Sequence, residues 1–130
     1  MRINKVSFTD KTIDQYNVII DVRTPLEYKE DHIPGSLNYA VLTNKQRHEI
    51  GIKYKENSFL AKKIGAQLIS QNIAKILGKI NFDKKETILI YCWRGGLRSL
   101  SLYLVLKQIG YDVYLLDGGY KVYRRNVVNY

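Results

Sequence analysis

The residues that could carry out chemistry surround the only cysteine of the chain, Cys92. This cysteine follows the apolar run Thr87–Tyr91 and opens the segment Cys92-Trp93-Arg94-Gly95-Gly96-Leu97-Arg98-Ser99. A cysteine attacks as its thiolate, and guanidinium groups, loop amides and a helix N-terminus all favour that charged form. The pattern therefore predicts Cys92 as a catalytic nucleophile rather than a small buried residue of the core.

The residues that follow Cys92 predict a loop that binds an anionic substrate, made of Trp93, Arg94, Gly95, Gly96, Leu97 and Arg98. The two glycines let the backbone curl so that successive N–H groups point inward, and the two arginines add positive charge. A sulfate-like, phosphate-like or selenophosphate-like group would fit such a loop. Trp93 has two expected roles of equal weight, which are stacking on a base or prenyl chain and packing at the loop edge.

A second catalytic group is not evident in the sequence. His32 and His48 are the only histidines; we expect His32 to fix a turn and His48 to face solvent. The chain lacks the Cys-His-Asn set of papain-like hydrolases. It also lacks a Gly-x-x-x-x-Gly-Lys-[Ser/Thr] loop and any metal-ligand spacing, so no metal is expected.

Composition indicates one soluble globular domain over residues 1–130. The chain is 45% hydrophobic and 25% charged, which is not typical of disorder. No apolar run approaches the roughly 20 residues that span a membrane, and Met1 leads into no signal-peptide stretch. A lone cysteine excludes an intramolecular disulfide. A cytoplasmic location is the expectation.

The net charge of +9 is unevenly distributed. Residues 39–85, which we call the basic stretch, contain ten Lys or Arg and three acidic residues. A basic face with nearby tyrosines suits RNA or another polyanion, although excess lysine also serves solubility alone.

Apolar patterning predicts strands that alternate with helices. The strands are expected at 6–8, 18–22, 37–41, 87–91 and 113–116, and the helices at 24–29, 44–50, 58–79, 97–109 and 120–128. Within 58–79 the apolar stripe changes side, so a bend or break is expected near Gly65. The alternation indicates an α/β fold with a mainly parallel central sheet flanked by helices. Ligands of such sheets lie at the C-terminal strand ends, where Cys92 and the segment Asp21-Val22-Arg23 are placed.

Three segments together resemble a rhodanese (sulfurtransferase) domain. They are Asp21-Val22-Arg23-Thr24-Pro25-Leu26-Glu27-Tyr28, His32-Ile33-Pro34-Gly35-Ser36-Leu37-Asn38, and Tyr91-Cys92 with its loop and residues 110–119. The resemblance implies a rhodanese-like fold in which the cysteine carries sulfur or selenium as a persulfide or perselenide. It also implies that Asp21 and Arg23 are structural supports of the site.

The loop from Tyr91 to Ser99, the segment Gly118-Gly119-Tyr120-Lys121 and the insertion of residues 42–55 are similar to the rhodanese part of the tRNA 2-selenouridine synthase family. That family replaces sulfur by selenium at the wobble 2-thiouridine of certain tRNAs. The resemblance implies a selenium or sulfur transferase that acts on tRNA without a bound cofactor. Selenophosphate would be the selenium donor, and a prenyl diphosphate the co-substrate of the whole enzyme.

Enzymes of that family continue into a second domain with a phosphate-binding loop, whereas this chain ends at Tyr130. We therefore expect the rhodanese subunit of a split enzyme, with the phosphate-loop domain on a separate polypeptide. A stand-alone sulfurtransferase is the alternative.

Two other classes of function stay open. Five residues separate Cys92 from Arg98, which is also the spacing of cysteine phosphatases, whose arginine clamps a phosphate. A phosphatase or arsenate reductase of the rhodanese fold is thus a rival, although Tyr91 stands where phosphatases usually have histidine. A non-catalytic module that docks a partner protein is the third reading.

Overall fold

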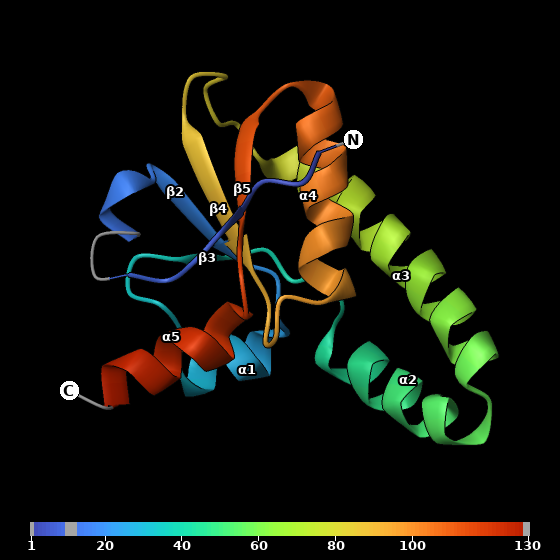
Figure 1. Ribbon diagram of the computed structural model, residues 1–130. Helices are drawn as coiled ribbons and strands as arrows, with labels where there is room; N and C mark the ends of the chain where they lie inside the picture. The colour runs from blue at the N-terminus through green and yellow to red at the C-terminus, as the bar shows by residue number, and fades with distance from the viewer. Residues whose placement is uncertain (1, 10–12, 129–130) are drawn as a thin grey trace.

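A computed structural model describes residues 2–9 and 13–128; the other residues of the domain expected over 1–130 lie outside the described part. Five parallel strands form one sheet in the order β1-β5-β4-β2-β3 (Figure 1). The α/β prediction is thus confirmed. The strands are β1 (Lys5–Val6), β2 (Val18–Asp21), β3 (Leu37–Asn38), β4 (Thr87–Tyr91) and β5 (Asp112–Leu116).

Helices lie on both sides of this sheet, with α3 and α4 together on one side and α1 near α5 on the other (Figure 1). They are α1 (Pro25–Glu30), α2 (Asn44–Glu56), α3 (Ser58–Lys79), α4 (Leu97–Ile109) and α5 (Gly119–Val128), with a short 3-10 helix at Ile13–Gln15 that the sequence did not predict. α2 packs on α3 rather than on the sheet. No helix in the described part is both long and apolar enough to cross a membrane.

The central strand β4 is buried on both faces, as its continuous apolar sequence predicts. Side chains alternate between faces along a strand. Ile88, Ile90 and Cys92 therefore face the core under α3 and α4, whereas Leu89 and Tyr91 face the core on the opposite side. Strand alternation alone thus places the thiol against α4.

The expected break near Gly65 is wrong, because α3 is one continuous helix of 22 residues. Ile64 and Leu68 face a small cavity shared with Ile50 of α2, while Ile73 and Ile76 pack in the core of the sheet. The apolar stripe changes side because the helix meets α2 first and the sheet later. One continuous helix satisfies both contacts.

The start of α2 also differs from the prediction. Thr43, not Asn44, is the N-cap, and its side chain and that of Gln46 form a reciprocal capping box. The Asn44 side chain instead accepts a hydrogen bond from the Leu26 N–H at 3.0 Å. Asn44 therefore ties α2 to α1, and α2 runs beyond the predicted end to Glu56.

Tyr91 offers a test of the core on the α5 side of the sheet. Its buried hydroxyl accepts from the Ile33 N–H at 3.1 Å and lies 3.1 Å from Ser36 Oγ. We predict that Tyr91→Phe lowers the free energy of unfolding by about 1–3 kcal/mol, because the Ile33 amide loses its partner. Urea denaturation measures this change. Tyr54→Phe, at a half-exposed position, should change it by less than about 0.5 kcal/mol, and equal effects would contradict the role of the hydroxyl.

Candidate active site

Cys92 is the first residue after β4, and only 3% of it is exposed. Its Sγ accepts a hydrogen bond from the Gly96 N–H at 3.1 Å, so one N–H of the loop points at the sulfur. The anion-binding role of the loop stays a prediction. Ser99 Oγ lies 3.1 Å from the same Sγ and 3.2 Å from the Gly96 carbonyl. The serine hydroxyl can donate to a thiolate, or donate to that carbonyl and accept from a thiol.

Ser99 is a site residue that the sequence analysis missed. It lies on the first turn of α4, seven residues after Cys92, and is buried. The sequence could have indicated this role, because Ser99 is the third residue of the predicted helix and a side chain in the first turn of a helix can face the loop that precedes it.

The loop after Cys92 is held by the turn between β5 and α5. The Tyr120 N–H donates to the Cys92 carbonyl at 2.8 Å, and the Lys121 N–H donates to the Trp93 carbonyl at 2.9 Å. This contact requires Gly119, whose φ is +62°. A Cβ there would lie 2.4 Å from the Cys92 carbonyl oxygen, closer than packed atoms approach.

The two loop arginines have different surroundings. Arg94 is exposed, and its side chain has no hydrogen bond or ion pair to any residue in the described ranges. Arg98 Nη1 lies 2.8 Å from Glu27 Oε1, and this pair is largely buried. Arg98 is therefore anchored to α1, and its predicted contact with a substrate anion stays a prediction.

Glu27 joins three elements of the site. Its Oε1 accepts from Arg98 at 2.8 Å, from Arg47 of α2 at 3.2 Å and from the Thr24 N–H at 3.2 Å. Burial acts to raise the pKa of Glu27, but the bonds and charges of these partners outweigh it and lower the pKa to about 2. The sequence analysis did not assign a role to Glu27 or Arg47.

Asp21 and Arg23 form the buried ion pair that the resemblance implied, with Arg23 Nη2 and Asp21 Oδ2 2.8 Å apart. The same Nη2 donates to the Asp31 carbonyl at 2.7 Å. The guanidinium lies 4.0 Å from the centre of the Tyr120 ring, within cation–π range. These contacts connect the end of β2 with the chain after α1 and with α5.

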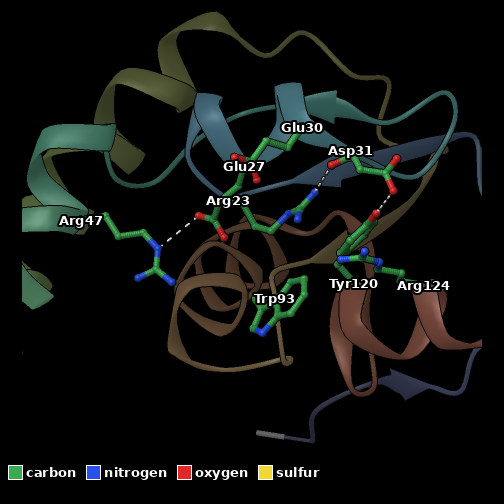
Figure 2. Close-up of a pocket in the computed structure, with 8 residues that line it drawn as sticks. All are labelled: Arg23, Glu27, Glu30, Asp31, Arg47, Trp93, Tyr120 and Arg124. Carbon is green, nitrogen blue, oxygen red and sulfur yellow. Dashed lines mark hydrogen bonds and ion pairs between the residues drawn. The ribbon is translucent and has the colours of Figure 1, made fainter.

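A cleft of about 480 Å³ opens beside the cysteine loop (Figure 2). Its lining residues are Arg23, Glu27, Glu30, Asp31, Arg47, Trp93, Tyr120 and Arg124. Tyr120 donates a hydrogen bond to Asp31, and burial together with this bond raises the pKa of Tyr120 to about 12. Its hydroxyl therefore stays protonated at neutral pH.

Neither histidine is among the residues that line the cleft. His32 Nδ1 is bonded to the Tyr28 carbonyl at 2.7 Å, and its ring stacks on Tyr28 at 3.7 Å. His48 is exposed on α2. Both positions agree with the structural roles predicted for them.

The parallel sheet and a strand-end cysteine loop define the class of protein. A family model described as "Rhodanese-like domain" matches residues 7–126, so the chain belongs to the rhodanese-like family.

Individual proteins of known name show which members of this family the chain is similar to. The tRNA 2-selenouridine synthase of Psychromonas ingrahamii is 37% identical over 114 residues, which cover 85% of this chain and 31% of that protein. The enzyme of the same name from Sulfurovum sp. is 36% identical over 110 residues, covering 82% and 30%. The chain is homologous to their rhodanese part and spans about a third of the length of these curated relatives.

A solved structure shows the same fold at similar sequence identity. It is described as "N-terminal domain of putative ATP/GTP binding protein from Clostridium difficile 630". It is 36% identical, has a TM-score of 0.81, and the match covers 98% of this chain and 99% of that one.

The low pKa of Glu27 predicts a pH dependence of stability. The pKa falls from 4.5 to about 2 on folding, so this contribution is complete above pH 4.5 and is lost as the pH falls toward 2. We predict that Glu27→Gln costs about 2 kcal/mol at pH 7 and less at pH 3. Urea denaturation at both pH values measures this. The control is Glu56→Gln, which removes an exposed pair with Lys53 and should cost under about 0.5 kcal/mol at either pH. If the loss of stability caused by Glu27→Gln is as large at pH 3 as at pH 7, the low pKa assigned to Glu27 is contradicted.

The contact between the two turns predicts a contrast between two glycine substitutions. Gly119→Ala should lower the free energy of unfolding by about 2–4 kcal/mol, since its Cβ meets backbone atoms and its φ is positive. Gly51→Ala in α2 meets nothing within 4 Å and should stabilise the protein by about 0.5–1 kcal/mol. Thermal and urea unfolding measure both. A neutral Gly119→Ala would show that the turn does not hold the cysteine loop.

Proposed function

We propose that this domain transfers a chalcogen, selenium or sulfur, through Cys92 in the conversion of tRNA wobble 2-thiouridine to 2-selenouridine. The observation that carries the proposal is the bond from the Gly96 N–H to Cys92 Sγ at the start of α4. A backbone donor and a helix N-terminus stabilise negative charge on that sulfur. The homology to tRNA 2-selenouridine synthases supports the nature of the reaction.

In this proposal each residue around the thiol has a different role. The loop backbone holds the sulfur, Ser99 supplies a hydroxyl 3.1 Å away, and the exposed Arg94 meets the incoming anion. With thiosulfate as the donor, the Cys92 thiolate attacks the outer sulfur. A sulfur–sulfur bond forms on the cysteine, the bond between the outer sulfur and the sulfite sulfur breaks, and sulfite leaves with the electron pair.

The proposal includes partners for the complete reaction. Selenophosphate is the selenium donor, tRNA is the acceptor, and the location is the cytoplasm. A phosphate-loop domain of the whole enzyme would hold the prenyl diphosphate. The similarity to the N-terminal domain of a protein named for ATP/GTP binding supports a nucleotide-binding companion.

A phosphatase reaction receives less support from the geometry. A phosphatase arginine offers a pair of N–H donors to the substrate phosphate, whereas in this structure Nη1 and Nη2 of Arg98 are both directed at Glu27. The bond to Glu27 therefore favours chalcogen transfer over the rival that shares its loop spacing.

Intact mass spectrometry after incubation with thiosulfate tests the transfer. We predict a gain of one sulfur on the wild-type chain that a reducing thiol removes, and no gain on Cys92→Ser. Arg94→Ala should slow the gain by about tenfold, the equivalent of 1.4 kcal/mol, while Lys79→Ala at the distant end of α3 should not. A gain that survives Cys92→Ser, or its complete absence, would overturn the proposal. Turnover of an aryl phosphate that Cys92→Ser abolishes would point to a phosphatase instead.

A further inference from the structure

A groove of about 450 Å³ lies between α1 and α2. It shares Glu27 and Arg47 with the cleft beside the cysteine loop, so the two hollows adjoin. Leu26 of α1 and Ile52 of α2 both line the groove, and they are 54% and 51% exposed. Large apolar side chains that gather in one exposed hollow are typical of a surface that binds another molecule.

α2 contributes one face to this groove. The helix packs on α3 rather than on the sheet, and the residues that it turns toward α1 are three or four positions apart. They are Asn44, Arg47, His48, Gly51, Ile52 and Lys55. A Cβ at Gly51 would meet no atom within 4 Å, so the groove is open along the middle of the helix.

The side-chain oxygens that line the groove already have partners. Both oxygens of Glu27 face Arg98, and Oε1 also accepts from Arg47. Thr24 Oγ accepts from the Glu27 N–H at 3.3 Å, and Asn44 Oδ1 accepts from the Leu26 N–H at 3.0 Å. The groove therefore presents no free carboxylate or carbonyl oxygen of a side chain to a ligand.

The polar groups left over are hydrogen-bond donors, and two of them are cations. Figure 2 shows that Arg47 uses its Nε for Glu27. Its two Nη groups, the Asn44 Nδ2 and the Lys55 Nζ make no hydrogen bond or ion pair with residues 2–9 and 13–128. Donors of this kind are satisfied by an anion that only accepts, such as a carboxylate, and a guanidinium can bind one with two N–H groups.

We propose that this groove docks a short acidic segment of a partner protein. An aliphatic side chain of the segment inserts between Leu26 and Ile52, and its carboxylates accept from Asn44, Arg47 and Lys55. Apolar anchoring in a groove with complementary charge around it is a common mode of peptide recognition. The docked segment lies against Arg47 and Glu27, next to the ion pair that anchors Arg98.

The lining of the groove favours a peptide over RNA. Proteins that hold single-stranded RNA stack its bases on aromatic side chains. The groove is lined by aliphatic Leu26 and Ile52 and by no Phe, Tyr or Trp of the described residues. A second copy of this chain is also disfavoured, because each copy has a net charge of +9 and like charges repel.

The groove is held in shape before a partner arrives. The Asn44 side chain ties the start of α2 to α1, and the Arg47 Nε ties the next turn to Glu27 at 3.2 Å. A surface that is already ordered loses little conformational freedom when a ligand binds. The docking site is therefore present in the isolated chain and is open to a direct binding experiment.

A displayed library of random short peptides, selected on the wild-type chain and counter-selected on Gly51→Leu, tests the proposal. Leucine at position 51 fills the groove, and the variant should fold because leucine is a better helix former than glycine. We expect the enriched peptides to combine an aliphatic residue with two or more Asp or Glu. Enrichment of peptides without an excess of acidic residues, or no enrichment over Gly51→Leu, would overturn the proposal.

Anisotropy of the enriched peptides, synthesised with a fluorescent label, measures the contribution of single residues. Gly51→Leu and Lys55→Glu should each weaken binding roughly tenfold or more. Gly78→Leu is the matched control for the first, since Gly78 of α3 is also exposed with an open Cβ position. Lys62→Glu on α3 makes the same charge change away from the groove. Both controls should bind as wild type does; a loss with Lys62→Glu equal to that with Lys55→Glu would show general attraction to a basic chain and overturn the site.

The other occupants give different results. Short single-stranded RNA that binds wild type and is lost in Gly51→Leu would show a nucleic-acid groove instead. Self-association that Gly51→Leu abolishes would assign the groove to a second copy. Either result overturns the acidic segment as occupant.

Docking and chalcogen transfer can fail separately. Peptide binding needs no sulfur donor, and Cys92→Ser should bind the peptides as tightly as wild type. Binding without a thiosulfate mass gain would therefore support the docking site and overturn the transfer, and a mass gain without peptide binding would do the reverse.

Discussion

Two backbone hydrogen bonds join the loop after β4 to the first turn of α5, and the geometry of the site depends on them. The Tyr120 and Lys121 N–H groups hold the carbonyls of Cys92 and Trp93. These amides would otherwise be unpaired donors at a helix N-terminus, and the carbonyls would be unpaired acceptors beside a buried sulfur. The backbones approach so closely that only glycine fits at position 119. The site is therefore assembled from two turns that are more than twenty residues apart.

Other contacts extend from this junction into the rest of the fold. Because its backbone is fixed, the Tyr120 ring lies over the guanidinium of Arg23, and its hydroxyl reaches Asp31. Arg23 is itself paired with Asp21 at the end of β2. On the other side of the loop, Glu27 holds Arg98 and Arg47. The ends of β2, β4 and β5 and the insertion that contains α2 are thus connected around one cleft.

In this rhodanese-like domain the neighbouring residues Cys92 and Trp93 lie on different sides of the same loop. The buried side of the loop holds Cys92 against α4, where a backbone N–H and a serine hydroxyl act on its sulfur. The open side presents Trp93 to a cleft whose charges balance. The proposed chemistry uses the first side.

Features that depend on residues close to one another along the chain could be predicted from the sequence. The strand Thr87–Tyr91, the helix Leu97–Ile109 with its Gly110 cap, the parallel α/β fold and the turn toward Cys92 Sγ all agree with the structure. Strand burial, helix caps and glycine turns are decided by residues within a few positions, so their signals are local. The structural role of Asp21 and Arg23 came instead from the resemblance to rhodanese domains, and the structure shows the two side chains as a buried ion pair.

Contacts between distant segments were decided only by the tertiary structure. The partner of Arg98 within the protein is Glu27, 71 residues away, and no feature of the loop sequence indicates this pair. The continuity of α3 was not predicted because its two apolar stripes face partners that the helix alone does not reveal. The sequence by itself determined that Cys92 ends a buried strand before a curled loop. The fold alone determined which charges surround that loop, because an ion pair across 71 residues depends on the path of the whole chain.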